Sequence, residues 1–381
     1  MKTPMTIPLT AFALTALWAC GDAREATGPR APSFSRATAD GSPGAVYVPT
    51  NATTGNEVLV FPRAPDGTLG TPSAFSTGGK GSGGGLGNQG AIVLTQGSRW
   101  LLVVNAGSSE LSVFAVGPDG LELTDRVSSG GELPVSVTAF RDLVYVLNAG
   151  GAGNISGFRF SRHGRLRPLP HSTRPLSSPA AGAAQVEFSP EGDVLVVTEK
   201  ATNTISTYVV KDDGRPAGPQ PQPSVGPTPF GFAFSHRGTL VVSEAFGGAA
   251  GASALSSYDV DDDGVLEVVS ASVGTTQTAA CWVVITRDSR FAYTTNTGSN
   301  TISAYRLGAD GALTLLAPTG GDGVTGAAPI DMALSRNDRF LYTLNTGDGT
   351  ISAFRVNPDG TLTSQVGAAG LPAGANGLAA R

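Results

Sequence analysis

The sequence predicts an all-β fold: a seven-bladed β-propeller with four antiparallel strands in each blade. Three observations predict it. A unit of about fifty residues recurs seven times, each unit holds short β-branched or aromatic runs, and no stretch keeps a helical period over three turns. Short strands bounded by Gly, Asn, Asp or Pro at this spacing are typical of propellers. Because 40% of the residues are hydrophobic and the net charge is only -5, the composition is that of a chain that buries a core and not of a disordered one.

Two independent markers give the count of seven units. An Asp-Gly turn, which supplies the positive φ angles of a tight hairpin, occurs in six units, and His163-Gly164 takes its place in the remaining one. Successive turns are separated by 53, 44, 50, 50, 47 and 49 residues. The residue that ends the second strand of each unit gives the same count: Asn51, Asn105, Asn148, Glu199, Glu244, Asn296 and Asn345.

The two ends of the repeat predict how the ring closes. The first unit begins with AVYV at 45–48, which matches the second strand of the other units, so its innermost strand is missing. The last unit is complete at Gln365, yet the chain continues with LPAGANGLAAR, which resembles the start of an innermost strand. We therefore expect a C-terminal strand, Ala373–Arg381, to complete blade one and to remove two open sheet edges.

The N-terminus carries an export signal. The apolar run from Ile7 to Trp18 is too short to span a bilayer as a stable helix. It ends in Leu-Trp-Ala-Cys, which resembles the lipobox of bacterial lipoproteins, so we expect a signal peptide over 1–20 and lipidation of Cys20. Because Trp18 is bulky for a lipobox, ordinary signal-peptidase cleavage with an incidental Cys20 is the alternative. Both interpretations export the protein to the periplasm or the cell surface.

Composition narrows the partners. Residues 21–44 are rich in Gly, Pro and Ser and predict a flexible linker before a propeller at 45–381. The net charge of -5 and the lack of a basic stripe argue against nucleic acid. We expect a monomer that contacts the membrane only through a lipid anchor, with a small molecule or an envelope protein as partner. The three histidines and two cysteines have no zinc spacing, so no metal and no cofactor are expected.

Several repeats carry a family resemblance. Tyr47-Val48-Pro49-Thr50-Asn51 and Tyr342-Thr343-Leu344-Asn345 resemble the YVTN-type repeat, and Asn-Thr-Ile-Ser at 203–206 and 300–303 strengthens the match. Residues 45–381 resemble the lactonase-family seven-bladed propellers, which include propeller-type 6-phosphogluconolactonases and the fungal 3-carboxymuconate cyclase. The resemblance implies a propeller fold and an activity on a lactone or an organic acid.

The family's site residues carry over only in part. The gluconolactonase-like members have Pro-Arg-His before one innermost strand, whereas this chain has Pro229-Phe230-Gly231 and so lacks the Arg and the His. A second family His corresponds to the stretch Ala-Ala-Gln at 183–185. Glu244 lies within one residue of the family's Glu. The acid/base residues of the family are therefore mostly absent, and so is the Arg that would bind the phosphate of a phosphosugar substrate.

The predicted ligand-binding residues lie at the channel. Aligning the units places Gln185, Trp282 and Asp331 at equivalent positions, with Gln89 and Cys281 close by. Propellers usually bind ligands at one channel mouth, where innermost strands begin, and Trp282 and Asp331 would pair a stacking surface with a carboxylate. The alternative is that these residues are ordinary channel side chains, solvated by water.

The predicted catalytic residues are Glu244, Glu199 and Lys200. Two adjacent units have Glu where five have Asn, in a chain poor in charge. If both carboxylates face one mouth, they can share a proton or serve as the base of a lactone hydrolase, with Lys200 or Gln185 as oxyanion donor. The alternative is a surface salt bridge between Glu199 and Lys200.

Other motifs are weaker. Cys281 is a candidate acyl nucleophile, but no His is near it in sequence, so a buried inert thiol is favoured. The acidic run 259–264 resembles a calcium loop, yet its twelfth position would be Ser270 rather than Glu. GLGNQG at 85–90 matches a dinucleotide motif by letter only, because no helix is predicted after it. We expect the glycine-rich stretch 78–90 to form a mobile loop over a channel mouth.

Two hypotheses for the function therefore remain. The first is a lactonase-like hydrolase or a muconate-type cyclase of the cell envelope, acting on a small lactone or acid. The second is a non-catalytic propeller that binds a small molecule or a protein. The family resemblance supports the first hypothesis, and the loss of the Arg and the His supports the second.

Overall fold

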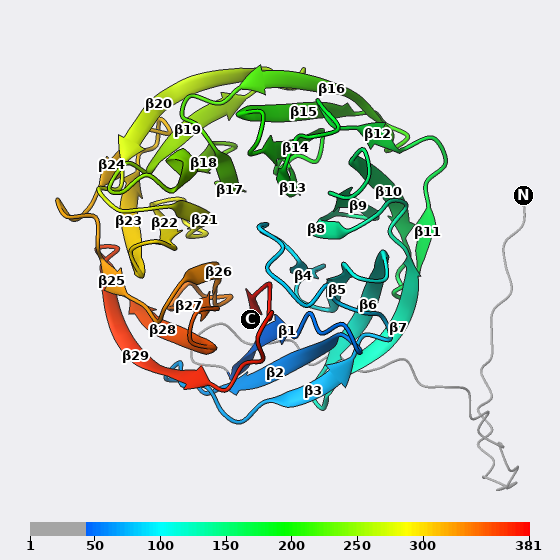
Figure 1. Ribbon diagram of the computed structural model, residues 1–381, viewed down its shortest axis with the longest axis horizontal. Coiled ribbons are helices and arrows are strands. Elements are labelled where there is room, and N and C mark those ends of the chain that lie inside the picture. The colour runs from blue at the N-terminus through cyan, green and yellow to red at the C-terminus, as the bar shows by residue number, and fades with distance from the viewer. Residues whose placement is uncertain (1–42) are drawn as a thin grey trace, which may run out of the picture. The chain divides into compact units, whose positions relative to one another are not determined.

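Residues 43–381 are described in the computed structural model, and they form seven antiparallel sheets arranged as a ring (Figure 1). The predicted signal peptide, Cys20 and nearly all of the predicted linker lie outside the described residues. Within residues 43–381 there is no α-helix, only a short 3₁₀ turn η1 (Phe246–Gly248), and none of the described helices is long and apolar enough to cross a membrane.

The blades are numbered in chain order. Blade one comprises β1 (Gly44–Pro49), β2 (Glu57–Arg63), β3 (Ser73–Ser76) and β30 (Ala379–Ala380). Blade two comprises β4 (Ile92–Thr95), β5 (Trp100–Asn105), β6 (Glu110–Gly117) and β7 (Gly120–Ser128). Blade three comprises β8 (Pro134–Phe140), β9 (Leu143–Asn148), β10 (Asn154–Phe160), β11 (Leu166–Pro168) and β12 (Arg174–Pro175).

The remaining four blades follow the same plan. Blade four comprises β13 (Ala183–Phe188), β14 (Val194–Glu199), β15 (Thr204–Val210) and β16 (Pro216–Pro223). Blade five comprises β17 (Pro229–Phe234), β18 (Leu240–Glu244), β19 (Ala254–Val260) and β20 (Leu266–Gly274). Blade six comprises β21 (Ala280–Ile285), β22 (Phe291–Asn296), β23 (Thr301–Leu307), β24 (Leu313–Leu315) and β25 (Gly323–Val324). Blade seven comprises β26 (Pro329–Leu334), β27 (Phe340–Asn345), β28 (Thr350–Val356) and β29 (Leu362–Ala369).

The second strand of each blade forms the core. Strands β5, β9, β14, β18, β22 and β27 are buried at every residue, because both faces of each sheet pack against a neighbouring blade. A strand covered on both faces reads as a continuous apolar run rather than an alternating one. Two of the short β-branched runs of the repeat, LLVV at 101–104 and VLVV at 194–197, are accordingly buried throughout.

In six of the seven blades, the recurring glycine of the hairpin turn docks its blade onto the preceding one. Its carbonyl accepts a hydrogen bond from a hydroxyl of the preceding blade, as from Tyr145 to Gly214 (2.7 Å) and from Tyr293 to Gly360 (2.9 Å). Tyr342 of blade seven bonds in the same way to Gly67 of blade one, at 2.7 Å. The turn that marks the repeat in the sequence therefore also joins the blades in space.

The C-terminus closes the ring, as predicted. Strand β30 pairs with β1 through Val46↔Ala380 and Tyr47↔Ala379, and so supplies the innermost strand of blade one. Backbone bonds between Ala45 and Arg381 (3.3 and 2.9 Å) extend the pairing. The regular strand is shorter than the predicted Ala373–Arg381, because the residues before it form a turn that buries Leu371 and Leu378.

Deleting residues 371–381 will lower the free energy of unfolding by at least about 3 kcal/mol. The deletion removes two buried leucines, Leu371 and Leu378, together with the strand that covers an edge of blade one. Thermal and urea unfolding, followed by far-UV circular dichroism, measure the change. Val366→Thr, on an outer strand and 75% exposed, is the control that should melt like the wild type. A truncated chain with an unchanged transition would contradict closure by the C-terminus.

Candidate functional site

A glycine-rich segment reaches into the central channel. Figure 1 shows the link between β3 and β4 curving toward the middle of the ring. Near its tip, the Asn88 side chain donates to the Val135 carbonyl of blade three. The backbone amide of Gln89 donates to the Ala184 carbonyl of blade four at 3.1 Å. Gly87 and Gly90 have φ values of 59° and 82°, which favour glycine. The prediction of a loop at the channel is confirmed in position, and its mobility stays a prediction.

Two glutamine side chains bond to innermost strands of other blades. Gln89 accepts from the Val283 amide (3.0 Å) and donates to the Val283 carbonyl (2.8 Å). Gln185 does the same with Phe232, at 2.7 and 2.9 Å. Each side-chain amide thus bonds to both the N–H and the C=O of one residue, as a neighbouring strand would, where the innermost strand has no further strand beside it. The polar atoms of both glutamines are therefore engaged within the protein.

Asp331 of β26, in blade seven, has a related role. Its carboxylate accepts from the Met332 amide (2.9 Å) and from the Leu378 amide of the closing segment (3.2 Å). It is only 3% exposed, and burial raises the pKa of Asp331 to about 7 although backbone amides oppose the shift. Asp331 thus links ring closure to the channel and changes protonation near neutral pH.

A cavity of about 250 Å³ lies in the channel. It is bordered by innermost strands, including Val93 of β4 and Ala139 of β8, and by Gln89 and Gly90 of the glycine segment. Residues of blades one, two, three, four and seven line it: Gln89, Gly90, Ile92, Val93, Val137, Thr138, Ala139, Gln185, Val186, Glu187, Asp331, Met332 and Leu378. Three of the five predicted ligand-binding residues, namely Gln89, Gln185 and Asp331, therefore share one cavity.

Glu187 is the functional candidate that sequence reasoning missed. It lines the cavity and accepts a hydrogen bond from Gln185 Nε2 at 2.9 Å. Burial raises the pKa of Glu187 to about 8, although the bond from Gln185 opposes the shift. A carboxyl group with a raised pKa on a cavity is a signature of acid/base function. The strand's period of two could have identified it, because residues 185 and 187 share a face.

Lys200, Trp282 and Cys281 lie together outside the cavity lining. The Lys200 ammonium is 4.6 Å from the centre of the Phe230 ring and donates to the Gly87 carbonyl, and Phe230 contacts Trp282 at 5.1 Å between ring centres. Burial lowers the pKa of Lys200 to about 8 and raises the pKa of the Cys281 thiol to about 11. Cys281 is therefore a buried, protonated thiol, which agrees with the inert interpretation.

Glu199 and Glu244 occupy equivalent positions in adjacent blades and are both fully buried. Glu199 accepts from Ser206 (2.8 Å) and from the amide of Ser177 (3.1 Å). In three other blades, the asparagine at this position bonds to the serine equivalent to Ser206: Asn105 to Ser112, Asn296 to Ser303 and Asn345 to Ser352. The predicted alternative of a surface salt bridge between Glu199 and Lys200 is wrong, because their side chains bond to different partners.

Glu244 is held in the same manner within blade five. It accepts from Ser256 (2.5 Å), Ser272 (2.6 Å) and the Gly226 amide (2.8 Å). Because each glutamate bonds to hydroxyls of its own blade, the structure does not bring the pair together at the channel cavity. Their assignment as catalytic bases, with Lys200 as donor, stays a prediction.

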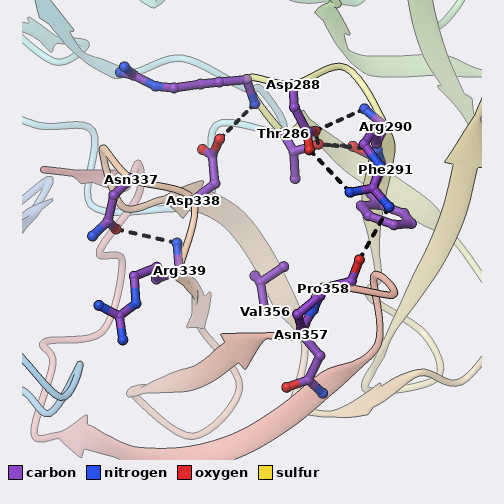
Figure 2. A pocket seen from close by; sticks show the side chains of 11 residues that line it. Thr286, Asp288, Arg290, Phe291, Asn337, Asp338, Arg339, Val356, Asn357 and Pro358 are labelled. Carbon is purple, nitrogen blue, oxygen red and sulfur yellow. Dashed lines mark hydrogen bonds and ion pairs between the residues drawn. The ribbon is translucent and has the colours of Figure 1, made fainter. Parts of the chain in front are cut away.

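A larger hollow of about 400 Å³ lies between blades six and seven, where Figure 2 shows its lining. Its charged groups bond to one another: Arg290 lies 3.7 Å from Asp288 and donates to the Pro358 carbonyl at 3.3 Å. The Arg287 amide donates to Asp338 at 2.8 Å, joining the two blades. This hollow is an exposed seam with paired charges, so the smaller channel cavity is the better candidate site.

The fold and site define a seven-bladed propeller with two carboxyl groups of raised pKa on its channel cavity. A family model described as "Lactonase, 7-bladed beta-propeller" matches residues 141–245 and 252–375, more than half of the chain. The chain therefore belongs to this lactonase family. No curated protein matches the sequence.

Solved structures share the fold at low sequence identity. A candidate 6-phosphogluconolactonase from Bacteroides fragilis aligns with a TM-score of 0.70 and 15% identity, covering 91% of this chain and 100% of that one. A periplasmic gluconolactonase from Pseudomonas aeruginosa aligns with a TM-score of 0.67 and 16% identity, covering 88% and 99%. A protein from Lactobacillus plantarum has a TM-score of 0.72 at 16% identity, covering 89% and 100%. At these identities the likeness shows the fold alone.

Stability should fall as the pH rises from about 5 to 8, because the folded state holds protons on Glu187 and Asp331 that the unfolded chain has released. Glu187→Gln removes one titration, so its unfolding free energy should depend less on pH, with the largest relative gain at pH 8. Urea unfolding at several pH values measures this. Glu191→Gln, an exposed carboxylate on the following hairpin, is the control and should keep the wild-type slope. An unchanged slope in Glu187→Gln would contradict the raised pKa.

Proposed function

We propose that this protein is a lactone hydrolase and that its reaction takes place in the channel cavity. The observation that carries the proposal is that two carboxyl groups with raised pKa, Glu187 and Asp331, line one cavity in a member of a lactonase family. Proton-transfer groups work best when their pKa is close to the working pH. The two side chains have values near 8 and 7, so both protonation states are accessible at neutral pH.

The chemistry follows from these values. Water adds to the lactone carbonyl carbon, its proton passes to ionised Asp331, and the ring C–O bond then breaks as the leaving oxygen takes a proton from Glu187. Thr138 also lines the cavity, and its hydroxyl accepts from the Phe188 amide at 3.3 Å, which leaves the hydroxyl proton available for donation to the oxyanion. The same groups would serve a cyclase that runs the reaction in reverse.

The hydrolase is tested with a panel of lactones of different ring size and purified protein. Wild type should hydrolyse at least one lactone, and Glu187→Gln should lower kcat/KM by about 10² or more, because general acid/base catalysis contributes about 10²–10⁴-fold. Asp331→Asn should give a similar loss. Release of acid, followed by pH indicator, measures turnover.

Matched variants separate the two sets of candidates. Glu191→Gln should keep the wild-type rate. Glu199→Gln and Glu244→Gln should lower stability but leave kcat within a few-fold, because their hydrogen bonds stay within one blade. If these two abolish turnover while Glu187→Gln does not, Glu199 and Glu244 are the catalytic groups instead. If no ring is opened, the protein is a binding propeller.

We also propose that the protein is exported and anchored by a lipid on Cys20. The short apolar run and the Leu-Trp-Ala-Cys sequence support this, and one structural neighbour is described as periplasmic. Expression of the full chain in a bacterium, followed by fractionation, tests it. Wild type should sediment with membranes and Cys20→Ser should not. A wild type that is already soluble outside the cytoplasm would contradict lipid anchoring.

A further inference from the structure

We propose that the channel cavity selects uncharged lactones of about one ring and rejects lactones that carry a phosphate or a carboxylate. This inference rests on the proposed function, because it names the substrate class of the same cavity. Three features carry it: the charges that line the cavity, the contacts of Lys200, and the cavity volume.

The lining has carboxyl groups and no counter-charge. Glu187 and Asp331 contribute the ionisable groups, and among the described residues that line the cavity there is no Lys, Arg or His. The other polar side chains of the lining are Thr138 and the amides of Gln89 and Gln185, and the two amides are bonded to Val283 and Phe232. An anionic substituent would therefore enter a partly buried space without a cation to pair with.

The lysine that contacts the glycine segment, Lys200, is already engaged elsewhere. Lys200 is not part of the lining, and its ammonium is held by the Gly87 carbonyl and by the face of the Phe230 ring. The glycine segment that carries Gly87 also carries Gln89, whose side chain borders the cavity. Lys200 thus contacts the segment at Gly87, which is not part of the lining, whereas Gln89 is, so a phosphate in the cavity has no ammonium among the described groups that line it.

An anion would also suppress the chemistry. A negative charge near Asp331 and Glu187 raises their pKa further, so the ionised form of Asp331 that accepts a proton from water becomes scarce at neutral pH. An uncharged ring avoids this, and its hydroxyl groups can bond to the carboxyl groups and to Thr138. The cavity of about 250 Å³ is smaller than the range of about 300–1,000 Å³ that is usual for drug-sized ligands, which limits the substrate to a small ring.

A matched pair of substrates tests the inference: a sugar δ-lactone and the same lactone phosphorylated on its exocyclic hydroxyl. At pH 7 the wild type should prefer the uncharged member by at least about tenfold in kcat/KM. Ala139→Lys adds a cation to the partly exposed lining and should shift this ratio toward the phosphorylated member. Ala139→Gln, of similar length but uncharged, is the control and should keep the wild-type preference. A wild type that prefers the phosphorylated lactone overturns the inference.

Binding separates this inference from the proposed function. Calorimetry with the corresponding lactams, which keep the ring and resist hydrolysis, should detect binding of the uncharged lactam and at least tenfold weaker binding of its phosphorylated form. If that holds but no lactone is hydrolysed, the substrate-class inference stands and the hydrolase proposal falls. If hydrolysis occurs but the phosphorylated lactam binds as well as the uncharged one, the inference falls and the hydrolase stands.

Discussion

The innermost strand of every blade has one edge with no strand beyond it, and this edge faces the channel. Its amides and carbonyls need partners, because buried backbone groups without hydrogen bonds are costly. In this protein, side chains provide them across blades: Gln185 bonds to Phe232, Gln89 to Val283, and Asp331 to Leu378. Many of the polar side chains at the channel therefore have a structural role, because they join neighbouring parts of the ring by hydrogen bonds.

This constraint decides which polar groups remain for chemistry. The amides of Gln89 and Gln185 are used by backbone, and the carboxylates of Glu199 and Glu244 are used by serine hydroxyls within their blades. Glu187 accepts a hydrogen bond from the side chain of Gln185 and lines the cavity. Of the two proposed acid/base groups, Asp331 also bonds to the closing segment, whereas Glu187 bonds to no backbone group of another blade within residues 43–381.

The repeat made the fold predictable, because its two markers recur for physical reasons. The glycine of the hairpin turn docks a blade onto its neighbour, and the residue that ends the second strand bonds, in five of the seven blades, to a serine of the third strand. Closure by the C-terminus followed from the same register. The site was less predictable. Glu187 shares the strand face of Gln185, but the irregular pairing between Ala183 and Gln185 and the path of the glycine segment into the channel depend on contacts between blades, which no local pattern encodes. The burial of Glu199 and Glu244 likewise depends on serines from other strands.

The central claim is that the channel cavity beside Glu187 is the reaction site. The most direct measurement is a crystal structure of the protein soaked with an uncharged lactam that resists hydrolysis. The account predicts the ring in the channel cavity, with its carbonyl or ring nitrogen within hydrogen-bonding distance of the Glu187 or Asp331 carboxyl group. A ring bound beside Lys200 and Trp282, or in the seam between blades six and seven, with the channel cavity empty, would contradict it.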